Sequence, residues 1–149
     1  MKTGQFFSGF GAVMLVVVLA ACGRAENMSA SSETLAATQA EGNTYQTLTL
    51  DAFADILNND ASNYTIVNVH IPYEGEIQGT DANIAYNDID ALTAALPDKN
   101  AQIILYCRSG NMSAQASRAL ADLGYTQIWD VPGGMNAWRE SGREILNDG

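Results

Sequence analysis

Residues 103–113 read IILYCRSGNMS, and this stretch decides the fold. Its first four residues form an uninterrupted apolar run, which suits a central strand of a parallel sheet covered on both faces. Turn-forming residues follow Cys107, and a helical pattern then runs from Ser113 to Leu123, where Gly124 is placed to end it. The stretch therefore predicts a buried strand, a sharp turn and a helix in direct succession.

The turn carries a candidate reactive site at Cys107. A chain that leaves a buried strand and enters a helix brings together several peptide N–H groups that lack helical partners. Gly110 permits a positive φ. Other residues common in turns and caps are Ser109, Asn111 and Ser113. Donors gathered beside a helix N-terminus stabilise an anion, so we predict that Cys107 is held as a thiolate, with the charge of Arg108 next to it.

Strand and helix patterns alternate around this stretch. Apolar runs predict further strands over residues 45–48, 64–69, 84–86 and 128–131. Helices are expected over residues 50–58 with Thr49 as cap, from a cap at Asn87 through Leu96 to Pro97, and after the turn Pro132-Gly133-Gly134. This order favours a single α/β domain with a largely parallel sheet.

Four motifs together resemble the rhodanese family over roughly residues 45–142. Residues 107–112 resemble the active loop of that family, a six-residue turn that opens with Cys-Arg. Residues 66–70 (IVNVH), 75–79 (GEIQG) and 133–138 (GGMNAW) resemble its second-strand, turn and closing motifs. The resemblance implies a rhodanese-like α/β fold, in which helices flank both faces of a central, mostly parallel, five-stranded sheet.

The resemblance also implies a sulfurtransferase that works through a persulfide on Cys107. The cysteine would attack a donor such as thiosulfate or a polysulfide and pass the outer sulfur to a thiol or cyanide acceptor. The persulfide-binding loop would comprise Arg108, Ser109, Gly110, Asn111, Met112 and Ser113. Covalent catalysis of this kind needs no cofactor. We also expect no metal site, because His70 is the only histidine and a usual zinc site would lack ligands.

Three positions depart from the family pattern and leave a second interpretation open. Asn68 and His70 stand where the family usually has Asp and Arg, so an ion pair with Glu74 is lost or depends on protonation of His70. Met112 closes the loop, which leaves Arg108 as its only cation and weakens the case for thiosulfate as donor. These departures motivate the alternative of a non-catalytic binding or scaffold module. A phosphatase or arsenate reductase with a Cys-x5-Arg loop does not fit, because Ser occupies the place of that Arg.

The first 43 residues predict a lipoprotein leader and a tether. Lys2 precedes an apolar run over residues 6–20, and Leu19-Ala20-Ala21-Cys22 resembles the lipobox of bacterial lipoproteins. The resemblance implies a signal peptide over residues 1–21, cleaved before an acylated Cys22. Residues 22–43 lack an apolar period and are typical of a flexible tether. An uncleaved membrane helix is the alternative interpretation of the apolar run.

These boundaries leave residues 44–149 for one rhodanese-like domain. If Cys22 is lipidated, we expect the domain outside the cytoplasm, on the periplasmic face, the outer membrane or the cell surface of a bacterium. The chain carries 7 basic and 17 acidic residues, a net charge of −10, which argues against nucleic acid as a partner. The expected partners are a small sulfur-containing anion or polysulfide, a thiol acceptor and, through the anchor, the membrane.

Overall fold

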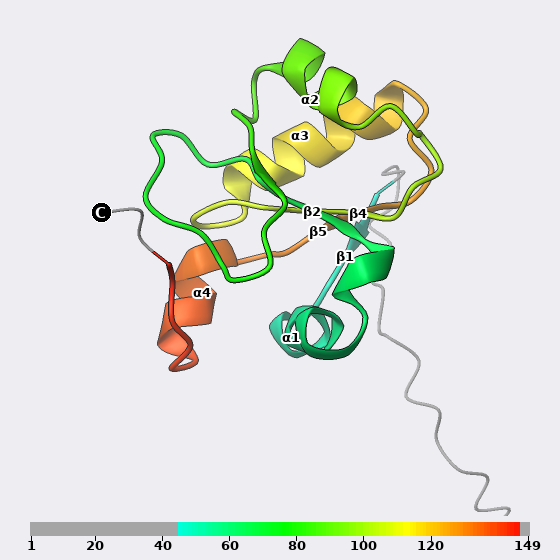
Figure 1. The fold of residues 1–149 in the computed structure, drawn as a ribbon. Helices are drawn as coiled ribbons and strands as arrows, with labels where there is room; N and C mark the ends of the chain where they lie inside the picture. The colour runs from blue at the N-terminus through cyan, green and yellow to red at the C-terminus, as the bar shows by residue number, and fades with distance from the viewer. Residues whose placement is uncertain (1–44, 147–149) are drawn as a thin grey trace, which may run out of the picture. The chain divides into compact units, whose positions relative to one another are not determined.

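The computed structural model describes residues 45–146, within which strands and helices alternate. The strands are β1 (Gln46–Thr47), β2 (Thr65–Asn68), β3 (Ala82–Asn83), β4 (Ile103–Tyr106) and β5 (Ile128–Asp130). The helices are α1 (Leu50–Asn59), α2 (Ile89–Ala95), α3 (Asn111–Asp122) and α4 (Gly134–Glu140), with a short 3-10 helix over Ala61–Asn63. The strands form one sheet in the order β1-β5-β4-β2-β3, and all neighbouring pairs are parallel (Figure 1). The predicted α/β fold with a five-stranded parallel sheet is confirmed.

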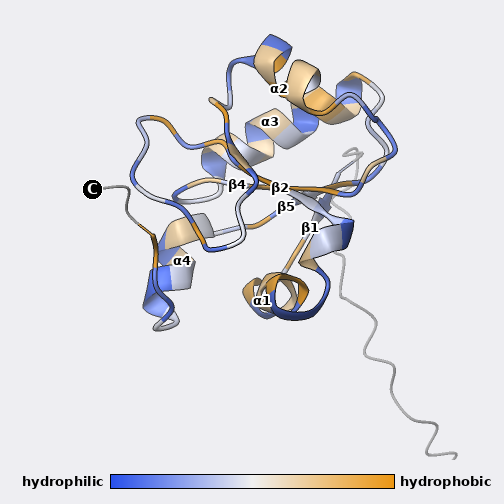
Figure 2. Cartoon of the chain, viewed as in Figure 1, coloured by the Kyte–Doolittle hydropathy of each residue, from blue (hydrophilic) through white to orange (hydrophobic). Residues whose placement is uncertain are grey.

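The sheet separates two hydrophobic cores, because successive side chains of a strand point to opposite faces. Ile103 and Leu105 of β4 belong to the core beneath α2 and α3, whereas Ile104 and Tyr106 belong to the core beneath α1 and α4. Figure 1 shows these two helix pairs on opposite sides of the sheet, and Figure 2 shows apolar colour along the central strands between them. All four residues of β4 are 0% exposed, as expected for a strand between two layers.

The helix after the reactive turn begins earlier than predicted. α3 starts at Asn111 rather than Ser113, because Gly110 adopts a left-handed φ of 92° and completes the turn there. Asn111, Met112 and Ser113 therefore belong to the first turn of the helix rather than to the loop before it. The irregular part of the site is only the segment from Cys107 to Gly110.

Two other predicted boundaries are wrong for local reasons. α2 is capped by Asp88 rather than Asn87, since the Asp88 carboxylate accepts the Ala91 N–H at 3.0 Å. The extended piece expected over residues 84–86 is displaced to β3, which pairs with the end of β2. The other predicted strands, and the helix expected over residues 50–58, agree with the structure to within one residue at each end.

The N-terminal part of the chain lies outside the described residues. This part holds the predicted signal peptide (residues 1–21), the predicted tether (residues 22–43) and the predicted lipidation site Cys22. Between residues 45 and 146, none of the helices combines the length and the apolar character needed to cross a membrane.

Candidate active site

Cys107 follows β4 directly, and the chain turns around its sulfur before α3 begins. The residue is 1% exposed. The Gly110 N–H donates to Sγ at 3.1 Å, and the Ser113 hydroxyl lies 3.6 Å from the same atom. Where several peptide donors were predicted, the part of the chain described here supplies one amide and one hydroxyl. Both favour a negatively charged sulfur, because a hydrogen bond to the charged form of a group stabilises that form.

The N-terminal end of α4 fixes the backbone of the turn. The Met135 N–H donates to the Cys107 carbonyl and the Asn136 N–H to the Arg108 carbonyl, both at 2.9 Å. Gly134 has a φ of 49°, and a Cβ at this position would lie 1.9 Å from the Cys107 carbonyl oxygen. The closing motif therefore contributes a backbone contact that only glycine allows at this distance.

Arg108, the cation predicted to lie next to the sulfur, forms an ion pair with Glu74. Nη1 of Arg108 lies 3.0 and 3.2 Å from the two carboxylate oxygens of Glu74. The same carboxylate lies 3.4 Å from Nε2 of His70, whose side chain is 3% exposed. Position 70 carries His, and the guanidinium that pairs with the carboxylate comes from the reactive turn.

Asn68 closes the segment that carries His70 and Glu74. Its Nδ2 donates to the Gly75 carbonyl at 3.0 Å, and its Oδ1 accepts the His70 N–H at 3.0 Å. Asn68 is 1% exposed, so both bonds are shielded from water. Asn68 thus fixes the backbone on both sides of Glu74, whose carboxylate binds Arg108.

The remaining predicted loop residues differ in exposure. Ser109 and Asn111 are exposed and carry no charge, whereas Met112 is half-buried against the core that contains the cysteine. Ser113 is 0% exposed, and its hydroxyl also lies 3.2 Å from the Gly110 carbonyl oxygen. Of the predicted loop, the groups that reach the sulfur are therefore the Gly110 amide and the Ser113 hydroxyl.

Asp130 is a buried carboxyl that was not among the predicted site residues. It ends β5, is 4% exposed, and its Oδ1 has no hydrogen-bond partner among residues 45–146. Burial raises the pKa of Asp130 to about 6, while the Ser113 hydroxyl and the Val131 amide act to lower it. The Ser113 hydroxyl has one proton, which it can donate to the sulfur, to the Gly110 carbonyl or to this carboxyl. The sequence did carry a signal for Asp130, because an acidic residue inside a predicted buried strand is unusual.

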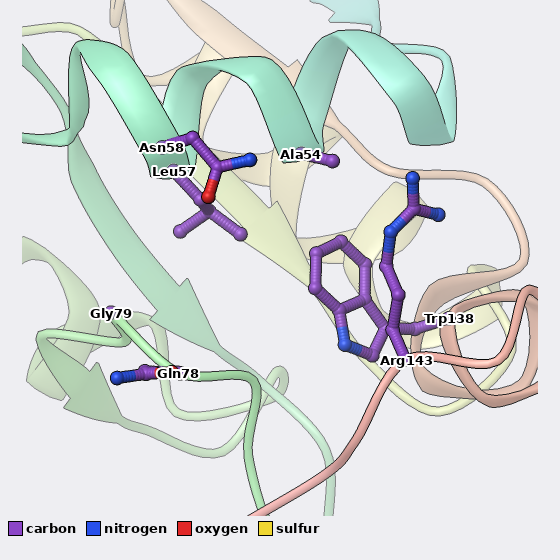
Figure 3. Close-up of a pocket in the computed structure, with 7 residues that line it drawn as sticks. All are labelled: Ala54, Leu57, Asn58, Gln78, Gly79, Trp138 and Arg143. Carbon is purple, nitrogen blue, oxygen red and sulfur yellow. The ribbon is translucent and has the colours of Figure 1, made fainter.

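A separate cavity of about 550 Å³ opens beside α1 and α4 (Figure 3). Its lining residues are Ala54, Leu57, Asn58, Gln78, Gly79, Trp138 and Arg143. The Arg143 guanidinium stacks 4.9 Å from the centre of the Trp138 ring. No residue of the reactive turn lines this cavity, so it is not the approach to Cys107. Over the described range, no group of three or more His, Cys, Asp or Glu residues is arranged to hold a metal ion.

The chain is similar to known proteins that carry a rhodanese-like domain. Residues 53–141 match the rhodanese-like domain family. Over 71 residues the chain is 34% identical to the thiosulfate sulfurtransferase PspE of Escherichia coli (strain K12), which covers 45% of this chain and 67% of that protein. Over 104 residues it is 28% identical to the adenylyltransferase and sulfurtransferase UBA4 of Lodderomyces elongisporus, which covers 62% of this chain.

The match to UBA4 covers only 23% of that protein, so it concerns one part of a longer chain. Among solved structures, a rhodanese-related protein from Thermoplasma volcanium superposes with a TM-score of 0.55 and 25% identity. The superposition covers 67% of this chain and 96% of that one. The likeness therefore extends over nearly the whole of that domain.

Proposed function

The chain belongs to the rhodanese-like family, and on that premise we propose that it is a sulfurtransferase that carries a sulfane sulfur on Cys107. The observation that carries this proposal is the environment of Sγ, which accepts the Gly110 N–H at 3.1 Å beside the Ser113 hydroxyl at 3.6 Å. A thiolate is the form of cysteine that attacks sulfur, and these donors stabilise it. The names of the two relatives, both of which include sulfurtransferase, support the same activity.

The proposed transfer consists of two displacements at sulfur. In the first, the Cys107 thiolate attacks the outer sulfur of the donor, and the bond from that sulfur to the rest of the donor breaks with its electron pair. With thiosulfate as donor, sulfite leaves and Cys107 becomes a persulfide anion. In the second, an acceptor thiolate attacks the outer sulfur and Cys107 leaves as a thiolate. The only other cysteine of the sequence is Cys22, the proposed lipidation site, so the acceptor comes from outside.

The test is the mass of the protein after exposure to a donor. In the full chain with Cys22→Ser, Cys107 is the only thiol, so any sulfur gained is assigned without digestion. We expect a mass gain of one sulfur atom after incubation with thiosulfate or polysulfide, and its loss after addition of a thiol or cyanide. Cys107→Ser in the same background is expected to gain nothing. A folded protein that gains no sulfur from either donor would favour the alternative, a binding or scaffold module.

We also propose that the domain works outside the cytoplasm, on a lipid anchor at Cys22. The support is the lipobox-like sequence Leu19-Ala20-Ala21-Cys22 after an apolar run. When the full chain is expressed in bacteria fed with labelled palmitate, we expect the protein to carry the label and to be recovered in the membrane fraction. Cys22→Ala should remove the label, whereas Cys107→Ser, the matched change at the other cysteine, should keep it. Retention of label by Cys22→Ala would contradict the anchor.

A further inference from the structure

We propose that Glu74 selects the sulfur donor, by holding Arg108 so that Cys107 accepts sulfur from monoanionic donors of the thiosulfonate class more readily than from dianionic thiosulfate. This inference rests on the proposed function, because it names the donor class of the same site. Glu74 lies outside the loop, residues 107–113, that the sequence predicts to carry out the reaction.

The reactive turn has one positive charge, and this charge is already paired. Arg108 is the only basic residue among residues 107–113. Its Nη1 donates to both carboxylate oxygens of Glu74, at 3.0 and 3.2 Å. The Arg108 side chain is 49% exposed and that of Glu74 is 36% exposed, so an anion in solvent can reach the pair.

The backbone on both sides of Glu74 is held by buried hydrogen bonds. Its Oε2 lies 3.4 Å from Nε2 of the buried His70, and Asn68 closes the backbone segment from residue 68 to residue 75. Beyond that segment, the Ile77 N–H donates to the Tyr106 hydroxyl at 2.9 Å, which ties the chain to the end of β4. Because this backbone is fixed, the Glu74 carboxylate stays within reach of Arg108.

Neither the reactive turn nor the exposed part of residues 71–74 offers a second cation to a dianion. The exposed turn residues Ser109 and Asn111 are uncharged. In the segment that leads to Glu74, Ile71 and Tyr73 are 37% and 41% exposed, and neither is basic. Thiosulfate carries two negative charges, so its approach leaves one of them beside an already neutralised guanidinium. A thiosulfonate carries one charge and replaces the other charged oxygen with a carbon substituent.

The chemical step is the same for both donors. The Cys107 thiolate attacks the terminal sulfur of the thiosulfonate, one S–S bond forms, and the bond from that sulfur to the sulfonyl sulfur breaks. The electron pair of the broken bond leaves with the sulfinate, just as it leaves with sulfite when the donor is thiosulfate. Cys107 ends as a persulfide anion in each case, so the rates of loading by the two donors can be compared directly.

The experiment compares second-order rate constants for sulfur loading by sodium methanethiosulfonate and by thiosulfate. The protein is the full chain with Cys22→Ser, at one low ionic strength. Glu74→Gln keeps the size of the side chain and removes its charge. The matched control is Asp122→Asn, which removes one exposed negative charge at the far end of α3, about 16 Å along the helix from its start. Because ion pairs as exposed as this one contribute little to stability, we expect Glu74→Gln to fold.

We expect the starting protein to load faster with methanethiosulfonate than with thiosulfate. Glu74→Gln should shift the ratio of the two rate constants about fivefold toward thiosulfate, the size that Coulomb's law gives for one unit charge acting on one extra unit charge across ~4 Å of water. Asp122→Asn should leave the ratio unchanged. In an Arg108→Gln background, Glu74→Gln should shift the ratio of rate constants much less, because the guanidinium that Glu74→Gln would release is absent.

Two outcomes would overturn the inference while leaving the sulfurtransferase intact. One is loading by both donors with a ratio that Glu74→Gln does not move. The other is an equal shift in the Arg108→Gln background, which would show that Glu74 acts by its own field and not by holding Arg108. If neither donor loads Cys107 in any of the folded proteins, it is the proposed function that fails.

Discussion

At the scale of single residues, Ser113 offers a direct test of how the sulfur is stabilised. Ser113 and Ser117 are both 0% exposed and lie one turn apart on α3, but only the Ser113 hydroxyl approaches Sγ. The Ser117 hydroxyl has no hydrogen-bond partner within the described part of the chain. The two serines therefore form a matched pair in which one hydroxyl serves the sulfur and the other does not.

We expect Ser113→Ala to slow sulfur loading from thiosulfate by about tenfold or more, because a hydrogen bond to a charged group contributes about 1.5–3 kcal/mol. Ser117→Ala should leave the rate unchanged and should not lower the free energy of unfolding, since it removes an unpaired hydroxyl. The loading rates come from reactions quenched at a series of times and measured by intact mass, and the free energies of unfolding come from urea titrations. Equal slowing in both variants would mean that Ser113 acts only through the packing of α3.

Asp130 makes the stability of the domain depend on pH in a direction opposite to that of most carboxylates. Its pKa is raised from 3.8 to about 6 by burial, so the folded state holds this proton more tightly than the unfolded state. Its contribution is therefore most favourable below about pH 4 and declines as the pH rises to about 6, where the folded carboxyl ionises. Because each tenfold change in proton affinity corresponds to about 1.4 kcal/mol, the stability lost over this window is about 3 kcal/mol.

We expect Asp130→Asn to be more stable than the starting protein at neutral pH and to differ little from it near pH 4. The measurement is the free energy of unfolding from urea titrations at a series of pH values in this window. Asp122→Asn, at an exposed position, is the control and should leave the pH dependence unchanged. A parallel pH profile for Asp130→Asn would show that the carboxyl titrates normally.

At the scale of elements, the sequence predicts the parts that depend on local pattern. The run of four apolar residues before Cys107 predicts β4 with its bounds, because a strand buried on both faces has no polar residue to interrupt it. Gly110 and the cysteine likewise mark the turn. The start of α3 was two residues off, since Asn111 and Met112 suit a turn and a first helical turn equally well.

What could not be predicted are contacts between segments far apart in the chain. Arg108 and Glu74 are separated by 34 residues, and both are residue types common on protein surfaces, so no sequence pattern predicts that they form an ion pair. The approach of Gly134 to the Cys107 carbonyl is of the same kind, because it depends on how α4 packs against the end of β4. The sequence identified the closing motif by resemblance, and the structure supplies its physical reason.

Gly134 allows a test of how α4 supports the reactive turn. A Cβ at this position would lie 1.9 Å from the Cys107 carbonyl oxygen, so Gly134→Ala must push α4 and the reactive turn apart. Gly124→Ala is the matched control: its φ is also positive, at 91°, but a Cβ there meets nothing within 4 Å. We expect the control to cost about 1–2 kcal/mol of unfolding free energy from the left-handed backbone alone.

For Gly134→Ala we expect this cost plus about 1–3 kcal/mol from overpacking, together with loss of most sulfur loading at temperatures where the protein is still folded. Thermal unfolding followed by circular dichroism reports the first effect, and intact mass after incubation with thiosulfate reports the second. Equal destabilisation by the two glycine variants, with loading intact, would contradict the proposed support of the turn by α4.

At the scale of the whole molecule, charge and local geometry act on the donor in the same direction. The chain has a net charge of −10, which repels an anionic donor over distances set by the ionic strength. The paired Arg108 offers no local attraction to offset that repulsion. The Gly110 amide and the Ser113 hydroxyl still stabilise one negative sulfur, so under the proposed function the site disfavours donors with two negative charges.

The salt dependence of loading separates these two contributions. Raising the salt from about 10 mM to about 150 mM shortens the screening length from about 30 Å to about 8 Å. We therefore expect the rate constant for thiosulfate to rise over this range, and that for methanethiosulfonate to rise less, because its charge is half as large. In Glu74→Gln the rise for thiosulfate should be smaller, since a released Arg108 attracts the donor and is itself screened. A rate for thiosulfate that falls with salt in the starting protein would show that an unpaired cation, not the net charge, governs the approach to Cys107.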